Sequence, residues 1–102
     1  MTTKTERVDK KMQKFSVSKS LTKNGVPPKK QGLIYYTCIN AQGETKEKIS
    51  DLCRETGGEY ANALYEFLTN PYVNHTYICD KYGISRNELF RLKIKFYKKW
   101  SQ

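Results

Sequence analysis

The chain has 102 residues and a mass of 11.9 kDa, with 19 lysines and arginines, 10 aspartates and glutamates, and a formal net charge of +9. This length suits one domain or a small domain with a tail, and a hydrophobic share of 37% limits the core. No apolar run approaches the roughly 20 residues of a membrane helix, and the first residues lack the apolar block of a signal peptide. We therefore expect a cytoplasmic protein with no membrane contact.

Positive charge gathers at the two ends of the chain. Residues 1–32 hold 9 basic and 2 acidic residues, residues 33–70 hold 3 and 6, and residues 71–102 hold 7 and 2. This layout is expected where an anionic polymer is held at two places, although lysines also serve solubility alone.

The first 32 residues predict a flexible basic arm. They are rich in Lys, Thr and Ser, and the Pro27-Pro28 pair favours an extended path over a helix. Val8, Met12 and Phe15 fall at helical spacing, so part of the arm could fold against a partner.

The remaining residues, 33–102, predict one folded domain. Its first segment, LIYYTCI at 33–39, is dense in β-branched and aromatic residues and predicts a short strand. The pairing of this strand stays open: it could pair with a segment of the arm or with a second copy of the chain, or it could form a short hairpin. The predicted helices follow, from residue 45 to the Gly57-Gly58 pair, from 59 to about 69, from roughly 74 to 82, and from 86 to about 99.

The run HTYICDKYGISRNELFRL has the residues that a tight corner between two helices requires. Cys79 is small enough for the crossing point, Gly83 permits a positive φ, and Ile84 is apolar and can fill the corner. Ser85 predicts a helix N-cap, and Glu88 three residues later completes a capping box.

This run resembles the helix-turn-helix of DNA-binding proteins, and YGISRNELFRLKIKF is similar to the turn and recognition helix of bacterial and phage regulators and of transposase N-terminal domains. The resemblance covers about forty residues, 59–99, and implies that the helix from 86 to 99 enters the major groove. It places Ser85, Arg86, Asn87, Phe90 and Arg91 at the DNA face. Further lysines are suited to phosphates, namely Lys93, Lys95, Lys98 and Lys99 on this helix and Lys29 and Lys30 on the arm.

The resemblance also implies individual roles. Arg86 could bond guanine, Asn87 could bond adenine, and Ser85 could hold a phosphate or its own helix cap. Phe90 either touches a thymine methyl group or packs back onto a neighbouring element. The alternative for the whole run is an ordinary helical hairpin with a solvated lysine face.

A similarity between two segments of the chain raises the question of a second helix-turn-helix. LCRETG at 52–57 aligns with ICDKYG at 78–83, but Gly58-Glu59 replaces the Ile84-Ser85 corner, and chance similarity is an alternative. Paired units with a basic arm are similar to the TraN type of accessory DNA-binding proteins from Gram-positive conjugative plasmids. The predicted fold is therefore mainly α, with one helix-turn-helix or two related ones, one short β-strand or hairpin as in winged-helix proteins, and the arm.

The sequence offers little for catalysis. His75 and Cys79 lie four residues apart, but no second pair of ligands accompanies them, and three widely spaced cysteines do not make a disulfide framework. We expect no metal, no cofactor and no enzymatic activity.

These patterns predict a sequence-specific double-stranded DNA-binding protein, either a transcriptional regulator or an accessory factor at an origin or recombination site of a plasmid, phage or other mobile element. The alternative is a protein-interaction adaptor that uses the strand at 33–39 and a tyrosine-rich surface. Binding of single-stranded nucleic acid is a third possibility, based on eight tyrosines beside lysines. Monomer and homodimer both stay open.

Overall fold

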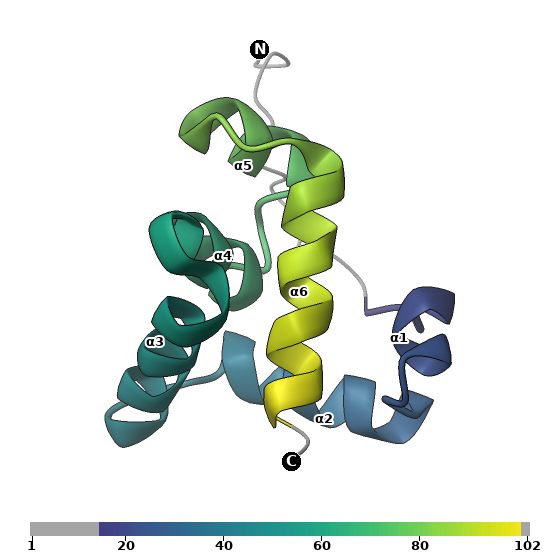
Figure 1. Ribbon diagram of the computed structural model, residues 1–102. Helices are drawn as coiled ribbons and strands as arrows, with labels where there is room; N and C mark the ends of the chain where they lie inside the picture. The colour runs from purple at the N-terminus through teal and green to yellow at the C-terminus, as the bar shows by residue number, and fades with distance from the viewer. Residues whose placement is uncertain (1–14, 101–102) are drawn as a thin grey trace, which may run out of the picture.

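The computed structural model describes residues 15–100, which form a bundle of helices. Its elements in chain order are α1 (Lys19–Lys23), α2 (Pro28–Ile39), α3 (Glu44–Gly57), the 3-10 helix η1 (Gly58–Tyr60), α4 (Ala61–Thr69), α5 (His75–Tyr82) and α6 (Arg86–Trp100). Figure 1 shows α6 running through the middle of the view, with α3 and α4 on one side, α1 on the other, and α2 crossing near its C-terminal end. Within the described residues, no helix combines the length and the apolar character that crossing a bilayer requires.

The helices predicted after residue 44 are confirmed. α3 ends at the predicted glycine pair, η1 and α4 cover the segment predicted from 59 to 69, and α5 and α6 match the last two predictions to within a residue. The apolar residues of α6 that were expected to face inward, Leu89, Leu92 and Phe96, are each at most 3% exposed. They pack in one core with Ile34, Ile49, Leu64 and Ile78.

The strand predicted for residues 33–39 is wrong, because these residues are the second half of α2. Ile34 and Cys38 lie one helical turn apart and are both buried, so this segment meets the core with helical spacing. Pro28 occupies the first turn of α2, where its missing N–H has no helical acceptor to lose. No strand forms among residues 15–100, and the winged-helix expectation has no wing there.

The N-terminal part of the described chain is built into the fold, which contradicts an arm over its whole predicted length. Leu21 and Val26 are 2% and 1% exposed, and Gln31 is fully buried. The Gln31 amide accepts from the N–H of Ser18 at 2.8 Å and donates to the carbonyl of Val26 at 2.9 Å, which ties the α1 segment to α2. The predicted domain boundary at residue 32 therefore falls inside α2. The other part of the predicted arm, with Val8 and Met12, lies outside the described residues.

Candidate nucleic-acid interface

The corner between α5 and α6 has the predicted geometry. Gly83 adopts φ 66° and ψ 35°, a left-handed conformation that glycine reaches without steric cost. The N–H groups of Gly83 and Ile84 both donate to the carbonyl of Cys79, at 2.9 and 3.2 Å. Ile84 is 3% exposed and fills the corner. The three residues between the helices thus fix the direction in which α6 leaves α5.

The start of α6 is capped by one half of the predicted capping box. The hydroxyl of Ser85 accepts from the N–H of Glu88 at 3.1 Å, as an N-cap does. The Glu88 carboxylate accepts instead from Arg91, at 3.1 Å from Nε and 2.6 Å from Nη2. The hydrogen bond to Arg91 and the nearby Arg91 and Lys95 charges lower the pKa of Glu88, so it stays ionised.

A carboxylate on α4 attaches α5 to the rest of the bundle. Glu66 accepts from the ammonium group of Lys81 at 2.9 Å and from the Tyr82 hydroxyl at 2.6 Å. Burial opposes ionisation of Glu66, but these two hydrogen bonds outweigh it and lower the pKa of the carboxyl group. Together with the shared apolar core, they make α4, α5 and α6 one packed unit.

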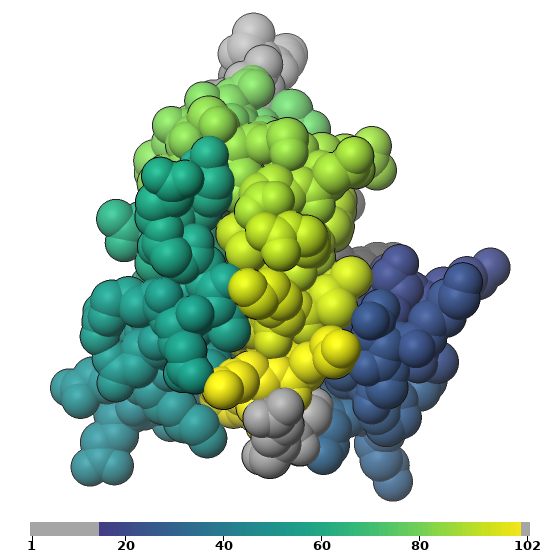
Figure 2. All heavy atoms as spheres, viewed as in Figure 1, coloured from purple at the N-terminus to yellow at the C-terminus, as the bar shows by residue number. Residues whose placement is uncertain are grey.

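The exposed side of α6 carries a line of polar and basic side chains. The helix has six basic residues and one acidic residue. Four exposed residues recur about every three or four positions and so share one side of the helix, Asn87, Arg91, Lys95 and Lys98. Figure 2 shows that the surface of α6 is open to solvent along its length between α3 and α1. We call these four residues the α6 stripe.

Other predicted contact residues flank this stripe. Arg86 is exposed at the start of the helix, with its guanidinium carbon 5.8 Å from the centre of the Phe90 ring. Lys99 is paired at 2.9 Å with Glu55 of α3. Lys29 is exposed and Lys30 half-buried in the first turn of α2.

Two predicted residues turn away from the stripe. The Phe90 ring lies 6.0 Å from Phe67 and 5.6 Å from His75, so of the two alternatives for Phe90 the structure has the packed one. The ammonium group of Lys93 lies 5.8 Å from the Phe67 ring and 5.7 Å from the Tyr97 ring. Both side chains are half-buried and pack against rings of the bundle.

Two basic residues near the stripe were not singled out from the sequence. Lys19 and Lys23 are exposed on α1, which packs beside α6. Figure 2 shows α1 projecting next to α6. The signal that could have found this helix is Ser18, whose hydroxyl caps the N–H of Leu21 at 3.2 Å.

The similarity between the segments at 52–57 and 78–83 does not extend to the geometry of the turns that follow them. Gly57 is helical, with φ −103°, and is buried so closely that a Cβ there would lie 3.4 Å from Leu64 Cδ2. The positive φ falls on the next residue, Gly58, whose ψ of −123° differs from that of Gly83. The segment from α3 to α4 therefore turns differently from the segment from α5 to α6.

The cysteines are placed for packing. Burial raises the pKa of the Cys38 thiol to about 12, and burial with a smaller effect of Cys38 raises that of Cys53 to about 12. Such thiols stay protonated at neutral pH and are poor nucleophiles. In the part of the chain that the structure describes, no three histidine, cysteine, aspartate or glutamate side chains gather as a metal site would require.

No protein-family model matches the chain, and searches of curated proteins and of solved structures give no match either. The observations that bear on function are therefore the packing of α4, α5 and α6 and the charge exposed along α6.

Proposed function

We propose that the chain is a sequence-specific double-stranded DNA-binding protein that places the exposed side of α6 in the major groove. The observation that carries this proposal is the α6 stripe, a row of amide, guanidinium and ammonium groups on a helix whose opposite side is buried. A major groove about 12 Å wide admits one α-helix, and Asn and Arg are the side chains that bond adenine and guanine there.

The order of the stripe suits this role. Asn87 and Arg91 lie in the first half of α6, near the corner, where the recognition helix of a helix-turn-helix meets base edges. Lys95 and Lys98 lie further along, where ammonium groups can neutralise phosphates. Arg86, exposed at the first position, extends the contact toward α5.

The neighbouring helices support one orientation of the duplex. Lys19 and Lys23 on α1 add positive charge on one side of α6. On the other side, the exposed Glu55 of α3 pairs with Lys99, so that cation is already engaged. Phosphates are therefore attracted more strongly to the first side, and we place the DNA backbone past α1.

The biological role follows from the resemblance of YGISRNELF to regulators of bacteria and phages. We place the protein among transcriptional regulators or accessory factors of mobile elements, acting at an operator, an origin or a recombination site.

Charge reversal on α6 tests the proposal. Arg86→Glu with Arg91→Glu should weaken binding to a selected duplex by at least about 100-fold in a fluorescence anisotropy titration at fixed salt. The matched control is Lys46→Glu with Arg54→Glu on α3. It changes the net charge equally, and Arg54 pairs with Asp51 three residues before it, as Arg91 pairs with Glu88. Equal losses in the two double variants would mean that only net charge matters, and no loss in either would exclude α6.

Removal of one acidic group from α6 gives a second test, in which DNA binding should become stronger. Glu88 holds Arg91 and places a negative charge at the start of α6. Glu88→Gln should therefore strengthen duplex binding, by about 3- to 10-fold for one removed carboxylate near phosphates. Asp51→Asn, which frees Arg54 on α3, is the control and should leave affinity unchanged. Weaker binding by Glu88→Gln would contradict the proposed placement of DNA.

A protein-binding adaptor is the second candidate, favoured by one observation on α2. Leu33 and Tyr36 are 62% and 49% exposed and lie three residues apart on one side of the helix. Under this function Leu33→Lys would remove partner binding, while Arg86→Glu with Arg91→Glu would leave it intact.

A further inference from the structure

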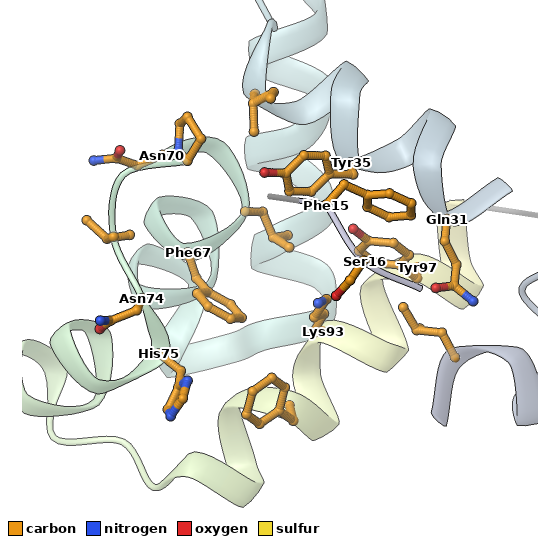
Figure 3. A pocket seen from close by; sticks show the side chains of 16 residues that line it. Phe15, Ser16, Gln31, Tyr35, Phe67, Asn70, Asn74, His75, Lys93 and Tyr97 are labelled. Atoms are coloured by element: carbon orange, nitrogen blue, oxygen red, sulfur yellow. The ribbon is translucent and has the colours of Figure 1, made fainter. Parts of the chain in front are cut away.

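A cavity of about 310 Å³ opens between the first half of the described chain and the α4–α6 unit. It is bounded by the segment at residue 15, by α2, by the end of α4, by the loop before α5, and by the inward side of α6. Figure 3 shows Phe67 and His75 on one side, Phe15, Tyr35 and Tyr97 on the other, and Lys93 between them. Its volume lies in the range of small-molecule sites, roughly 300–1,000 Å³.

Aromatic rings form much of the apolar wall. Five rings come from four parts of the chain, the segment before α1, α2, α4 and α6: Phe15, Tyr35, Phe67, Phe90 and Tyr97. The Phe67 and Phe90 rings meet edge to face at 6.0 Å, a stable arrangement that holds both in place. A flat ring could therefore enter without a rearrangement of these two walls.

Lys93 supplies the charge in this cavity. It is half-buried, and its ammonium group lies within 6 Å of the Phe67 and Tyr97 ring centres. No carboxylate of residues 15–100 forms an ion pair with it. Burial lowers the pKa of Lys93, which reflects the cost of a desolvated cation, and the Phe67 and Tyr97 rings compensate part of that cost.

The oxygens of the nearby amide groups are already engaged. Gln31 uses its amide on Ser18, Thr22 and Val26. Asn70 accepts from the N–H of Tyr72, and Asn74 caps α5 by accepting from Tyr77. Lys93 is thus the basic lining residue that a ligand anion could meet, since no ion pair among residues 15–100 engages it.

We propose that this cavity binds a small aromatic carboxylate, with the carboxylate on the Lys93 ammonium group and the ring between Phe67, Phe90 and Tyr97. An anion would compensate the desolvated cation, and the apolar ring would fill the aromatic space. The site lies on the inward side of α6 and does not depend on whether the outward side binds DNA.

The test is a titration of the full-length protein with benzoate, followed by amide chemical shifts in ¹H–¹⁵N spectra. Benzamide is the neutral aromatic probe and cyclohexanecarboxylate the non-aromatic anion. We expect saturable shifts at residues around the cavity with benzoate, and at least tenfold weaker binding of each of the other two compounds. Lys93→Met, which keeps most of the side-chain stem, should weaken benzoate binding at least tenfold. Lys98→Met on the exposed side of α6 should not.

Three outcomes would overturn the proposal. Shifts confined to exposed lysines without saturation would show only general ion attraction. Equal binding of benzamide and benzoate would remove the role of the charge, and this comparison requires no variant that must fold. Equal affinity of Lys93→Met and the unaltered protein would show that the carboxylate does not meet this lysine.

Discussion

Gln31 is the side chain whose replacement most directly tests whether the α1 segment belongs to the core. Its amide makes four hydrogen bonds: from Ser18 N–H at 2.8 Å, and to Val26 O at 2.9 Å, Thr22 Oγ1 at 3.0 Å and Ser18 O at 3.2 Å. Gln31→Leu removes all four and keeps a side chain of similar size in the same space.

The expected loss of stability in Gln31→Leu depends on which of the former hydrogen-bond partners of Gln31 water can reach. Val26 is 1% exposed, so its carbonyl loses a partner in a buried site, at about 1–3 kcal/mol. Ser18 is half-buried, so its N–H loses part of a similar amount, whereas Thr22 is exposed and can bond water. The Ser18 carbonyl keeps its bond from the N–H of Thr22 at 3.1 Å. We expect a total loss of about 2–4 kcal/mol in the free energy of unfolding, after some gain from the apolar leucine.

Urea unfolding followed by circular dichroism measures this loss. The control is Gln42→Leu, the same chemical change at an exposed position between α2 and α3, which should stay within about 0.5 kcal/mol. If α1 were a detachable arm, Gln31→Leu would speed hydrogen exchange in residues 18–26 and leave global stability unchanged. That pattern, or equal effects of the two substitutions, would refute the argument that α1 is part of the cooperative core.

Three further predictions concern the α4–α6 unit and the thiols. Gly83→Ala should cost about 1–2 kcal/mol in urea unfolding, because its positive φ and not crowding opposes a Cβ, and Gly83→Asn should cost less; equal costs would contradict this. Despite its burial, hydrogen bonds lower the pKa of Glu66 from 4.5, so its ionised form stabilises the fold above that pH and this contribution disappears as pH falls through the lowered pKa. The stability difference between Glu66→Gln and the unaltered protein should therefore shrink from pH 7 to pH 3, and a constant difference would argue against the pairing. Cys79 should react with a disulfide reagent before the buried Cys38 and Cys53, and mass spectrometry after partial labelling would reveal any other order.

The helices from residue 44 onward were predictable because each carries its own boundary signals. Gly57-Gly58 and Gly83 end helices, Asn74 and Ser85 begin them, and the apolar residues between recur at helical spacing. These signals are local, and the surrounding structure agrees with them.

The helix α2 was mispredicted because its composition and its contacts disagree. LIYYTCI has the residue types of a strand, but the side chains that reach the core are Gln31, Ile34 and Cys38, at helical intervals. The first of these is polar, so its burial depends on partners in α1 and the following loop that no local pattern reveals. Packing of the whole chain decided the conformation against β propensity.

Local signals predicted one part of the candidate interface, and contacts with other helices decided the rest. The exposure of Arg86, Asn87 and Arg91 agrees with a helix that begins at the corner. The inward orientation of Phe90 and Lys93 depends on the rings of Phe67 on α4 and His75 on α5, and helical spacing alone does not show that these rings lie there.

The central position of α6 has a consequence for how the chain acquires its structure during synthesis. The buried residues of the earlier helices, such as Ile34, Ile49 and Leu64, share one core with Leu89 and Phe96 of α6. As the chain emerges from the ribosome, α1 to α5 appear first, and the apolar residues that α6 covers are still exposed. The core is therefore complete only when the last helix packs, and until then these residues are open to chaperones and to other nascent chains.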